Sequence, residues 1–164
     1  LAWIISTVVS EMHTGEYLST LVAGNIHAGF LPVILFLLAG VMAFATGTSW
    51  GTFGIMLPIA AAMAVKVEPA LIIPCMSAVM AGAVFGDHCS PISDTTILSS
   101  TGAHCNHIDH VTSQFPYALT VAASAAIGYL ILGMTGSAPL GFVVTGIVMV
   151  VLIFILKDKN KATA

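Results

Sequence analysis

Two short polar breaks interrupt the long apolar runs that make up most of this chain. The first break covers residues 46–52 and the second covers residues 86–96. As a straight helix, the run 30–65 would be about 54 Å long, whereas the hydrocarbon core of a bilayer is about 30 Å thick. The run 69–103 has nearly the same length. Each run is too long for one span and too short for two, so the pattern predicts two interrupted units, each a span plus a half-helix or a re-entrant hairpin.

The other segments are shorter and are separated by polar residues. A single transmembrane domain over 1–164 accommodates all of them. The expected fold class is therefore an all-α, polytopic membrane protein with two discontinuous or re-entrant helix units. Besides these units, the pattern predicts a helix remnant at 1–12, an interfacial helix at 14–25, spans at 111–135 and 140–156, and a tail at 157–164.

Composition also indicates a membrane protein. Hydrophobic residues make up 58% of the chain, charged residues 7%, and the mean hydropathy is +1.04. A soluble domain carries about a quarter of its residues as charges. All four basic residues are lysines, so the chain lacks the basic, arginine-bearing surface of a nucleic-acid-binding protein, and we expect no nucleic acid partner. The lysine cluster at 157–161 predicts a C-terminus on the cytoplasmic side of the cell membrane.

The second break carries two acidic residues, Asp87 and Asp94. An ionisable side chain at the bilayer centre costs about 2.5 to 3.5 kcal/mol on insertion scales, so such residues are usually functional. Loose backbone groups at membrane depth persist only where protein buries them or where they line a watery cavity. The break is therefore a candidate binding site. The alternative interpretation is that both aspartates cap helix ends or meet solvent in a loop outside the membrane.

Local sequence predicts different surroundings for the two acids. Ser90 is a good N-cap residue and Pro91 suits the first helical position, so a new helix should begin there, with Asp94 in its first turn. Asp87 should follow the end of the preceding helix, where free carbonyl groups favour a cation or a proton over a bare carboxylate. A carboxylate that binds either Na+ or H+ supplies the competition that cation/proton exchange requires. Hydroxyl oxygens suited to a hard cation come from Ser90, Ser93 and Thr95.

The first break carries no charge but several hydroxyl groups. Gly47 and Gly51 would let backbone carbonyl groups turn inward, toward a bound cation. The alternative is that the small residues of this break let two helices pack closely. The candidate cation ligands in this break are Thr46, Thr48 and Ser49.

A polar loop after the second unit carries several metal-ligating residue types. Structural zinc sites usually have two separated ligand pairs, whereas here the ligand types crowd into one loop. We therefore favour a polar, pH-responsive loop and expect no bound metal or other cofactor. The weaker zinc alternative would use His104, Cys105, His107 and His110.

Several segments carry a family pattern, and its sharpest motif is residues 86–96. The same pattern also covers residues 45–52, the whole run 85–100 around that motif, and residues 106–110 followed by 114–119. Together they resemble the C-terminal part of NhaC-type Na+/H+ antiporters, over residues 1 to about 129. The resemblance implies a fold of inverted repeats in which discontinuous helices meet at the ion site.

The resemblance also implies roles for individual residues. Two positions depart from the family pattern: His104 stands where a small residue is expected, and Asn106 stands where aspartate is common. These departures bear on pH sensing by the loop and not on exchange itself. The implied ion and proton ligands are Asp87, Ser90, Ser93, Asp94 and Thr95 in the second break, and Thr46, Thr48 and Ser49 in the first.

We therefore expect a secondary antiporter that exchanges Na+ for H+, and not an enzyme, since no nucleophile elbow, phosphate loop or zinc-protease motif is present. One alternative is a related antiporter for a drug or for an organic anion of the dicarboxylate or lactate type. Another is a membrane metal-binding protein. Expected partners are membrane lipid, the transported Na+ and H+, and a missing N-terminal repeat of the same transporter, with a homo-oligomer left open. We interpret the chain as the C-terminal part of a longer, bacterial transporter.

Overall fold

Helices account for almost all of the chain that the structure describes. The computed structural model describes residues 27–162 continuously, together with the isolated positions 4, 7, 8, 11–13, 17 and 20. Apart from these positions, the segments 1–12 and 14–25 lie outside the described residues. The main elements are α3 (Leu31–Thr46), α4 (Ser49–Val67), α5 (Ile72–Cys89), α6 (Asp94–Gly102), α7 (His107–Thr135) and α8 (Ala138–Ala162), with short 3-10 turns η1 (Ala28–Phe30) and η2 (Pro69–Leu71).

Within the described residues, five helical segments are long and apolar enough to cross a membrane. The shortest of them have 19 residues, which corresponds to about 28 Å of helix and so matches the hydrocarbon core. The chain is therefore an all-α, polytopic membrane protein, as the hydropathy pattern predicts. The five segments are Ala28–Thr46, Ser49–Val67, Pro69–Cys89, His107–Thr135 and Ala138–Leu156.

The two interrupted units differ in length. In the second unit, α5 is followed by the nine-residue α6, which is a span plus a half-helix, as the length of the apolar run predicts. In the first unit, α3 and α4 are both span-length, so the expectation that 30–65 is too short for two spans is wrong. The helical run begins earlier, at Ala28, and ends later, at Val67, while the turn between its arms uses only two residues.

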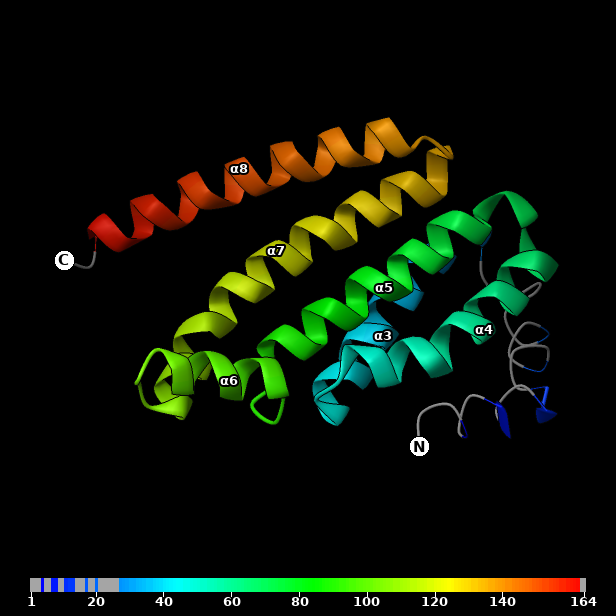
Figure 1. Cartoon of the computed structure of the whole chain (residues 1–164). Coiled ribbons are helices and arrows are strands. Elements are labelled where there is room, and N and C mark those ends of the chain that lie inside the picture. The colour runs from blue at the N-terminus through cyan, green and yellow to red at the C-terminus, as the bar shows by residue number, and fades with distance from the viewer. Residues whose placement is uncertain are drawn as a thin grey trace.

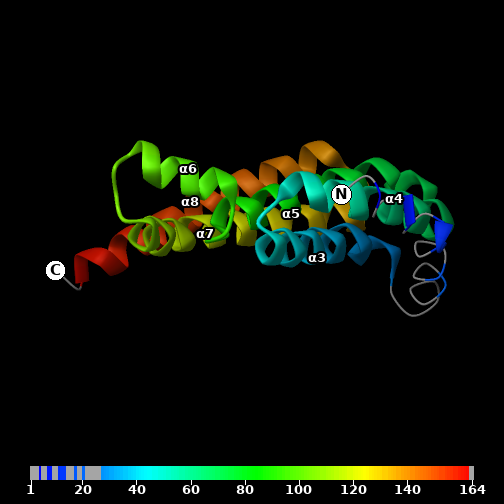
Figure 2. The same ribbon diagram turned by 60° about the horizontal axis from the view of Figure 1, so that its bottom comes forward.

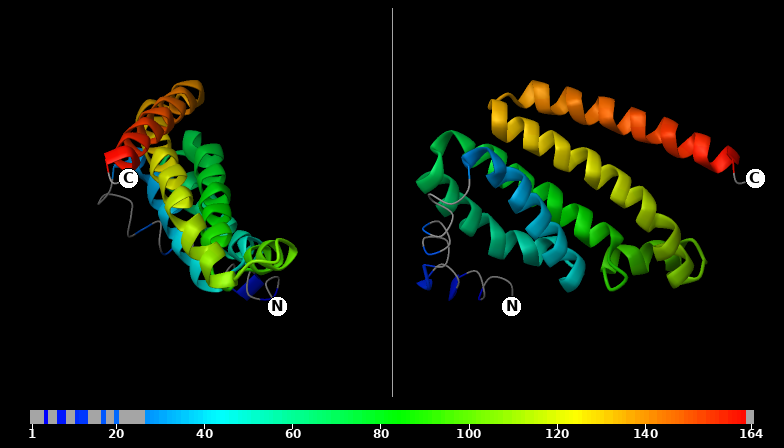
Figure 3. Two further views of the ribbon diagram at one scale, coloured as in Figure 1. Left: turned by 90° about the vertical axis from the view of Figure 1, so that its left-hand side faces the viewer. Right: turned by 180° about the vertical axis from the view of Figure 1, so that it is seen from behind.

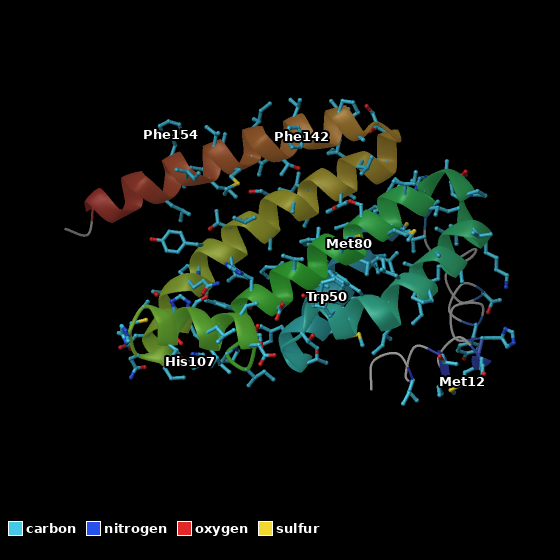
Figure 4. All side chains as sticks on the ribbon, viewed as in Figure 1. Met12, Trp50, Met80, His107, Phe142 and Phe154 are labelled. Carbon is cyan, nitrogen blue, oxygen red and sulfur yellow. The ribbon has the colours of Figure 1, made fainter. Side chains whose placement is uncertain are left out.

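The long helices lie side by side, and α8 is the outermost. Figure 1 shows α8, α7, α5 and α4 in that order, and the reverse view in Figure 3 shows α3 packed over α5 between α7 and α4. Figure 2 shows α6 over the first turns of α7. On α8, the exposed side chains of Phe142 and Phe154 project away from the bundle (Figure 4), as expected for a surface in contact with lipid.

The helices α3 and α5 pack closely against each other through glycine. A Cβ atom on Gly82 would clash with the carbonyl oxygen of Phe36, and one on Gly86 would clash with the carbonyl oxygen of Gly40. The two backbones therefore touch directly, in the small-residue packing that is typical of membrane helices. We call this contact the α3–α5 seam. It holds the last turn of α5 against the end of α3.

Replacing Gly82 with alanine should destabilise the protein. The added methyl group would meet the backbone of Phe36, so the helices must separate, and overpacking of this kind costs about 1–3 kcal/mol. Thermal unfolding of the purified protein in detergent measures the effect. Gly146→Ala is the matched control, because a Cβ atom at that position meets nothing within 4 Å. Equal unfolding temperatures for the two variants would contradict close packing at the seam.

Candidate functional site

The two breaks lie against each other at one end of the bundle (Figures 1 and 3). The buried Ser90 ends α5, and its hydroxyl donates a hydrogen bond of 2.8 Å to the carbonyl oxygen of Phe44, on α3. Gly47 sits in the left-handed region at φ +68°, where a Cβ atom would lie 2.8 Å from the carbonyl oxygen of Ile92. A polar contact and a close backbone contact therefore join the breaks.

The local sequence of the first break forms a tight turn between two helices. Gly47 ends α3, where its positive φ costs glycine little, and its N–H donates to the carbonyl oxygen of Ala43. The Thr48 side chain then caps α4 by accepting a hydrogen bond of 3.3 Å from the N–H of Gly51. Ser49 becomes the first residue of α4 and is buried against α5.

The half-buried carboxylate of Asp87 receives a hydroxyl group from each break. The Ser49 hydroxyl donates to Asp87 Oδ2 at 2.9 Å, and the Ser93 hydroxyl donates to Asp87 Oδ1 at 2.6 Å. Both serine side chains are buried. Thr95 extends the network, with its Oγ1 2.7 Å from Ser93 Oγ. Four of the residues that the sequence proposes as ligands thus form one hydrogen-bonded group, which we call the Asp87 network.

The second break starts its helix later than its sequence predicts. Ser90 and Pro91 were expected to begin a helix, but α6 begins at Asp94 with Ser93 as its N-cap. The side chain of Ser93 accepts a hydrogen bond of 3.2 Å from the N–H of Thr95. The expectation is wrong because the Ser90 hydroxyl ties the break to α3, while Pro91 and the next residue form the turn.

Helix dipoles converge on Asp87 from more sides than the sequence predicts. Asp87 lies in the last turn of α5, near the negative end of that helix, as expected. Its two hydrogen-bond donors, however, are the first residue of α4 and the N-cap of α6. The positive ends of two helices therefore face the carboxylate. They favour a negative charge at this point, or a ligand that presents the negative end of its dipole.

Four of the eight proposed ligands lie outside this group: Ser90 and Thr48, whose hydrogen bonds are described above, and Asp94 and Thr46. Asp94 is the exposed first residue of α6, where the helix dipole favours its carboxylate. Thr46 is also exposed, and its hydroxyl donates to Met42 of its own helix at 2.9 Å. Within the part of the chain that the structure describes, no hydrogen bond joins either residue to Asp87.

The histidine-rich loop does not assemble a metal site among the described residues, where no three His, Cys, Asp or Glu side chains come close enough to hold a metal. Cys105 donates to a backbone carbonyl of Ser100, and His107 contacts two neighbouring oxygen atoms. His104 adopts φ +51°, a left-handed conformation that glycine adopts at the least cost. The zinc alternative, which also includes His110, therefore receives no structural support.

Sequence reasoning missed the role of Gln114. Its amide donates a hydrogen bond of 2.6 Å to the carbonyl oxygen of His88, which also accepts a bond of 3.3 Å from the Thr96 hydroxyl. This carbonyl lies in the last turn of α5, where a helix leaves its acceptors unpaired. The sequence carried one signal of this role, because Gln114 is a polar amide inside an otherwise apolar span.

A groove of about 810 Å³ runs between α5 and α7, beside the Asp87 network but separate from it. Most of its walls are apolar, with a few polar side chains among them. Its lining residues are Phe36, Ser77, Met80, Ala81, Val84, Phe85, His88, Gln114, Tyr117, Ala118, Val121, Ala122, Ala125 and Tyr129.

Span-length helices whose breaks enclose a carboxylate are typical of polytopic, ion-coupled membrane transporters. Comparison with known proteins identifies the family. Residues 1–134 match the sequence model described as the Na+/H+ antiporter family, and the chain belongs to that family. Membership of this family indicates that the protein is a transporter.

Relatives of the chain come from bacteria and an archaeon. The chain is 65% identical to an uncharacterized protein of Haemophilus influenzae, over 96% of this chain and 30% of that protein. It is 27% identical to a malate-2H(+)/Na(+)-lactate antiporter of Bacillus subtilis, over 79% of this chain and 30% of that protein. It is 33% identical to an arginine/ornithine antiporter of Halobacterium salinarum, over 70% of this chain and 27% of that protein. The chain thus spans less than a third of the length of these relatives. No solved structure matches it.

Replacing Ser90 with alanine should loosen the contact between the breaks. The change removes the hydrogen bond that Ser90 donates to Phe44 and the bond of 3.4 Å that it accepts from the N–H of Ile92, and each loss of this kind costs about 0.5–1.5 kcal/mol. Hydrogen-exchange mass spectrometry of the purified protein should show faster exchange at 90–93. Ser99→Ala is the control, since the exposed Ser99 hydroxyl donates to the carbonyl of Thr95 in its own helix. Unchanged exchange in the Ser90 variant would mean that this bond does not hold the breaks together.

Proposed function

We propose that the chain is the C-terminal part of an NhaC-type secondary antiporter that exchanges Na+ for H+ across the cell membrane. The family supports antiport, and the short coverage of the relatives supports a longer parent protein. The observation that carries the proposal is the convergence of Ser49 and Ser93, one from each break, on the carboxylate of Asp87.

In this proposal Na+ binds at the Asp87 network. The carboxylate supplies negative charge, and each serine hydroxyl can turn its proton away and offer a lone pair to the ion. Oxygen atoms of this kind are what a hard cation prefers, by extension from the oxygen ligands of other hard cations. Thr95, at 2.7 Å from Ser93, supplies a further hydroxyl oxygen next to the carboxylate.

A proton competes with Na+ for the same carboxylate. When Asp87 is protonated, its negative charge is lost, and its O–H donates to a serine oxygen that would otherwise face the cation. Binding of one species therefore excludes the other. A carrier that holds one ion at a time, and that is seldom empty, moves the two ions in opposite directions across the membrane.

The other residues of the breaks have supporting roles in this proposal. Thr48 caps α4 and so places Ser49, while Ser90 holds the second break against α3. Asp94 stabilises the start of α6. Thr46, whose hydroxyl donates to Met42 of its own helix, would reach an ion only after a change in conformation. The opposing, N-terminal repeat would cover the exposed side of α6.

The lysine tail sets the proposed orientation. With residues 157–161 in the cytoplasm, the C-terminal end of α8 lies on the cytoplasmic side. Figure 1 shows that both breaks lie toward this end of the bundle. The Asp87 network would therefore lie in the cytoplasmic half of the transporter.

Asp87→Asn in the full-length transporter tests the proposal. Asparagine keeps the shape of the side chain but can neither carry the negative charge nor exchange a proton, so Na+-driven proton flux in vesicles should fall to that of protein-free vesicles. Asp109→Asn is the control, because Asp109 is exposed in the first turn of α7 and should leave the flux unchanged. Normal flux in the Asp87 variant would refute the assignment.

A second candidate function is exchange of an organic solute coupled to Na+ or H+. The groove between α5 and α7 favours it, because apolar walls with a few polar groups such as His88, Gln114 and Tyr117 suit a small organic molecule. The relatives named for lactate and malate, and for arginine and ornithine, are also antiporters of organic solutes.

Filling this groove separates the two functions. Val121 lines the groove, so Val121→Trp should reduce uptake of labelled lactate, malate or arginine while Na+-driven proton flux persists. Val143→Trp is the matched control, since Val143 is exposed on α8 and outside the groove. If vesicles containing the unaltered transporter take up none of these solutes, exchange of these solutes is excluded.

A further inference from the structure

His107 reaches from the start of α7 to the turn of the second break. Its Nε2 lies 2.7 Å from the carbonyl oxygen of Pro91, and its Nδ1 lies 3.1 Å from the hydroxyl of Ser100 on α6. The side chain is half-buried. Figure 4 labels it at the end of the bundle where α6 meets α7. One side chain thus joins three consecutive elements.

The bond to Pro91 persists in both protonation states of the imidazole. The Pro91 carbonyl can only accept, so Nε2 must carry a proton. Ser100 has one hydroxyl proton and also lies 3.0 Å from the carbonyl oxygen of Ile97. A neutral ring accepts that proton at Nδ1, whereas a charged ring donates to Ser100, which then donates to Ile97. Either arrangement leaves Nε2–H on Pro91.

His107 is not needed to begin its own helix. Asn106 already caps α7, because its side-chain oxygen accepts from the N–H groups of Ile108 and Asp109 at 2.9 and 3.4 Å. The ring of His107 instead points back to the turn 90–93. Its contacts therefore serve the break that precedes α6.

Two hydrogen bonds from different elements anchor the first two residues of the turn 90–93, and the last residue of the turn, Ser93, belongs to the Asp87 network. The Ser90 hydroxyl binds the carbonyl of Phe44. His107 binds Pro91, two residues before Ser93. The Ser93 hydroxyl then meets Asp87 at 2.6 Å. Loss of either anchor would let this short turn move the serine away from the carboxylate.

We propose that His107 is a positioning residue of the ion site, which holds Ser93 against Asp87 through its hydrogen bond to the Pro91 carbonyl. The inference rests on the proposed ion-exchange function. Its role is to set the affinity for Na+, and not to bind the ion or the proton.

Kinetics of the full-length transporter test the proposal. His107→Ala should raise the Na+ concentration for half-maximal flux roughly fivefold, the effect of one lost hydrogen bond, with the maximal rate changed by less than about twofold. His107→Gln should restore affinity, because its amide reaches the position of Nε2, whereas the shorter His107→Asn should not. His110→Ala is the control on the same helix and should leave both constants unchanged. Equal Na+ affinities of the His107→Ala variant and the unaltered protein would overturn the proposal. Equal Na+ affinities of the His107→Gln and His107→Asn variants would also overturn it.

A double-mutant cycle with Ser93 tests the route of the effect. If His107 acts through Ser93, then adding His107→Ala to Ser93→Ala should lower Na+ affinity little further. Additive losses would overturn the proposal. Failure of the underlying function is distinguishable, because then Asp87→Asn would retain normal flux. Should His107→Ala yield no folded protein, the comparison of the Gln and Asn variants still decides.

Discussion

The rest of the site depends on two hydrogen bonds to one carboxylate, from Ser49 and Ser93 to Asp87. A partly buried charge in an apolar bundle must be paired or hydrogen-bonded, and here both carboxylate oxygen atoms have donors. The donors come from segments far apart in the chain, so the carboxylate joins the start of α4 to the start of α6. The two helix starts are held near each other by that shared contact.

The breaks can share Asp87 because each completes its own helix ends locally. Thr48 caps α4 and Ser93 caps α6, while Gly47 closes α3. Each break thereby pairs a backbone group at every one of these helix ends without using the carboxylate. The Na+/H+ antiporter family and the antiporters related to this chain differ in the solutes that they are named for. The groove between α5 and α7 is separate from the Asp87 network, so a substitution in the lining of one leaves the contacts of the other in place.

Hydropathy was sufficient to predict the helical class and the two breaks, and the acidic residues within an apolar run pointed to Asp87. Other features depended on contacts that a single sequence does not contain. Ser90 and Ser93 are equally good N-caps, and only the carbonyl of Phe44 selects between them. The α3–α5 seam requires knowing which helix faces Gly82. The ring of His107 can bind a metal through an unprotonated nitrogen or donate an N–H to a backbone carbonyl, so residue type alone could not assign it.

The α3–α5 seam has a mechanical consequence. Two helices separated by long side chains can slide past one another as those side chains change rotamer, but at Gly82 and Gly86 backbone meets backbone and no side chain is available to rearrange. The two helices must then travel as one rigid body that carries Asp87 with it. The position of Asp87 relative to the first break is therefore set by the backbone contact itself, and not by the rotamers of packed side chains.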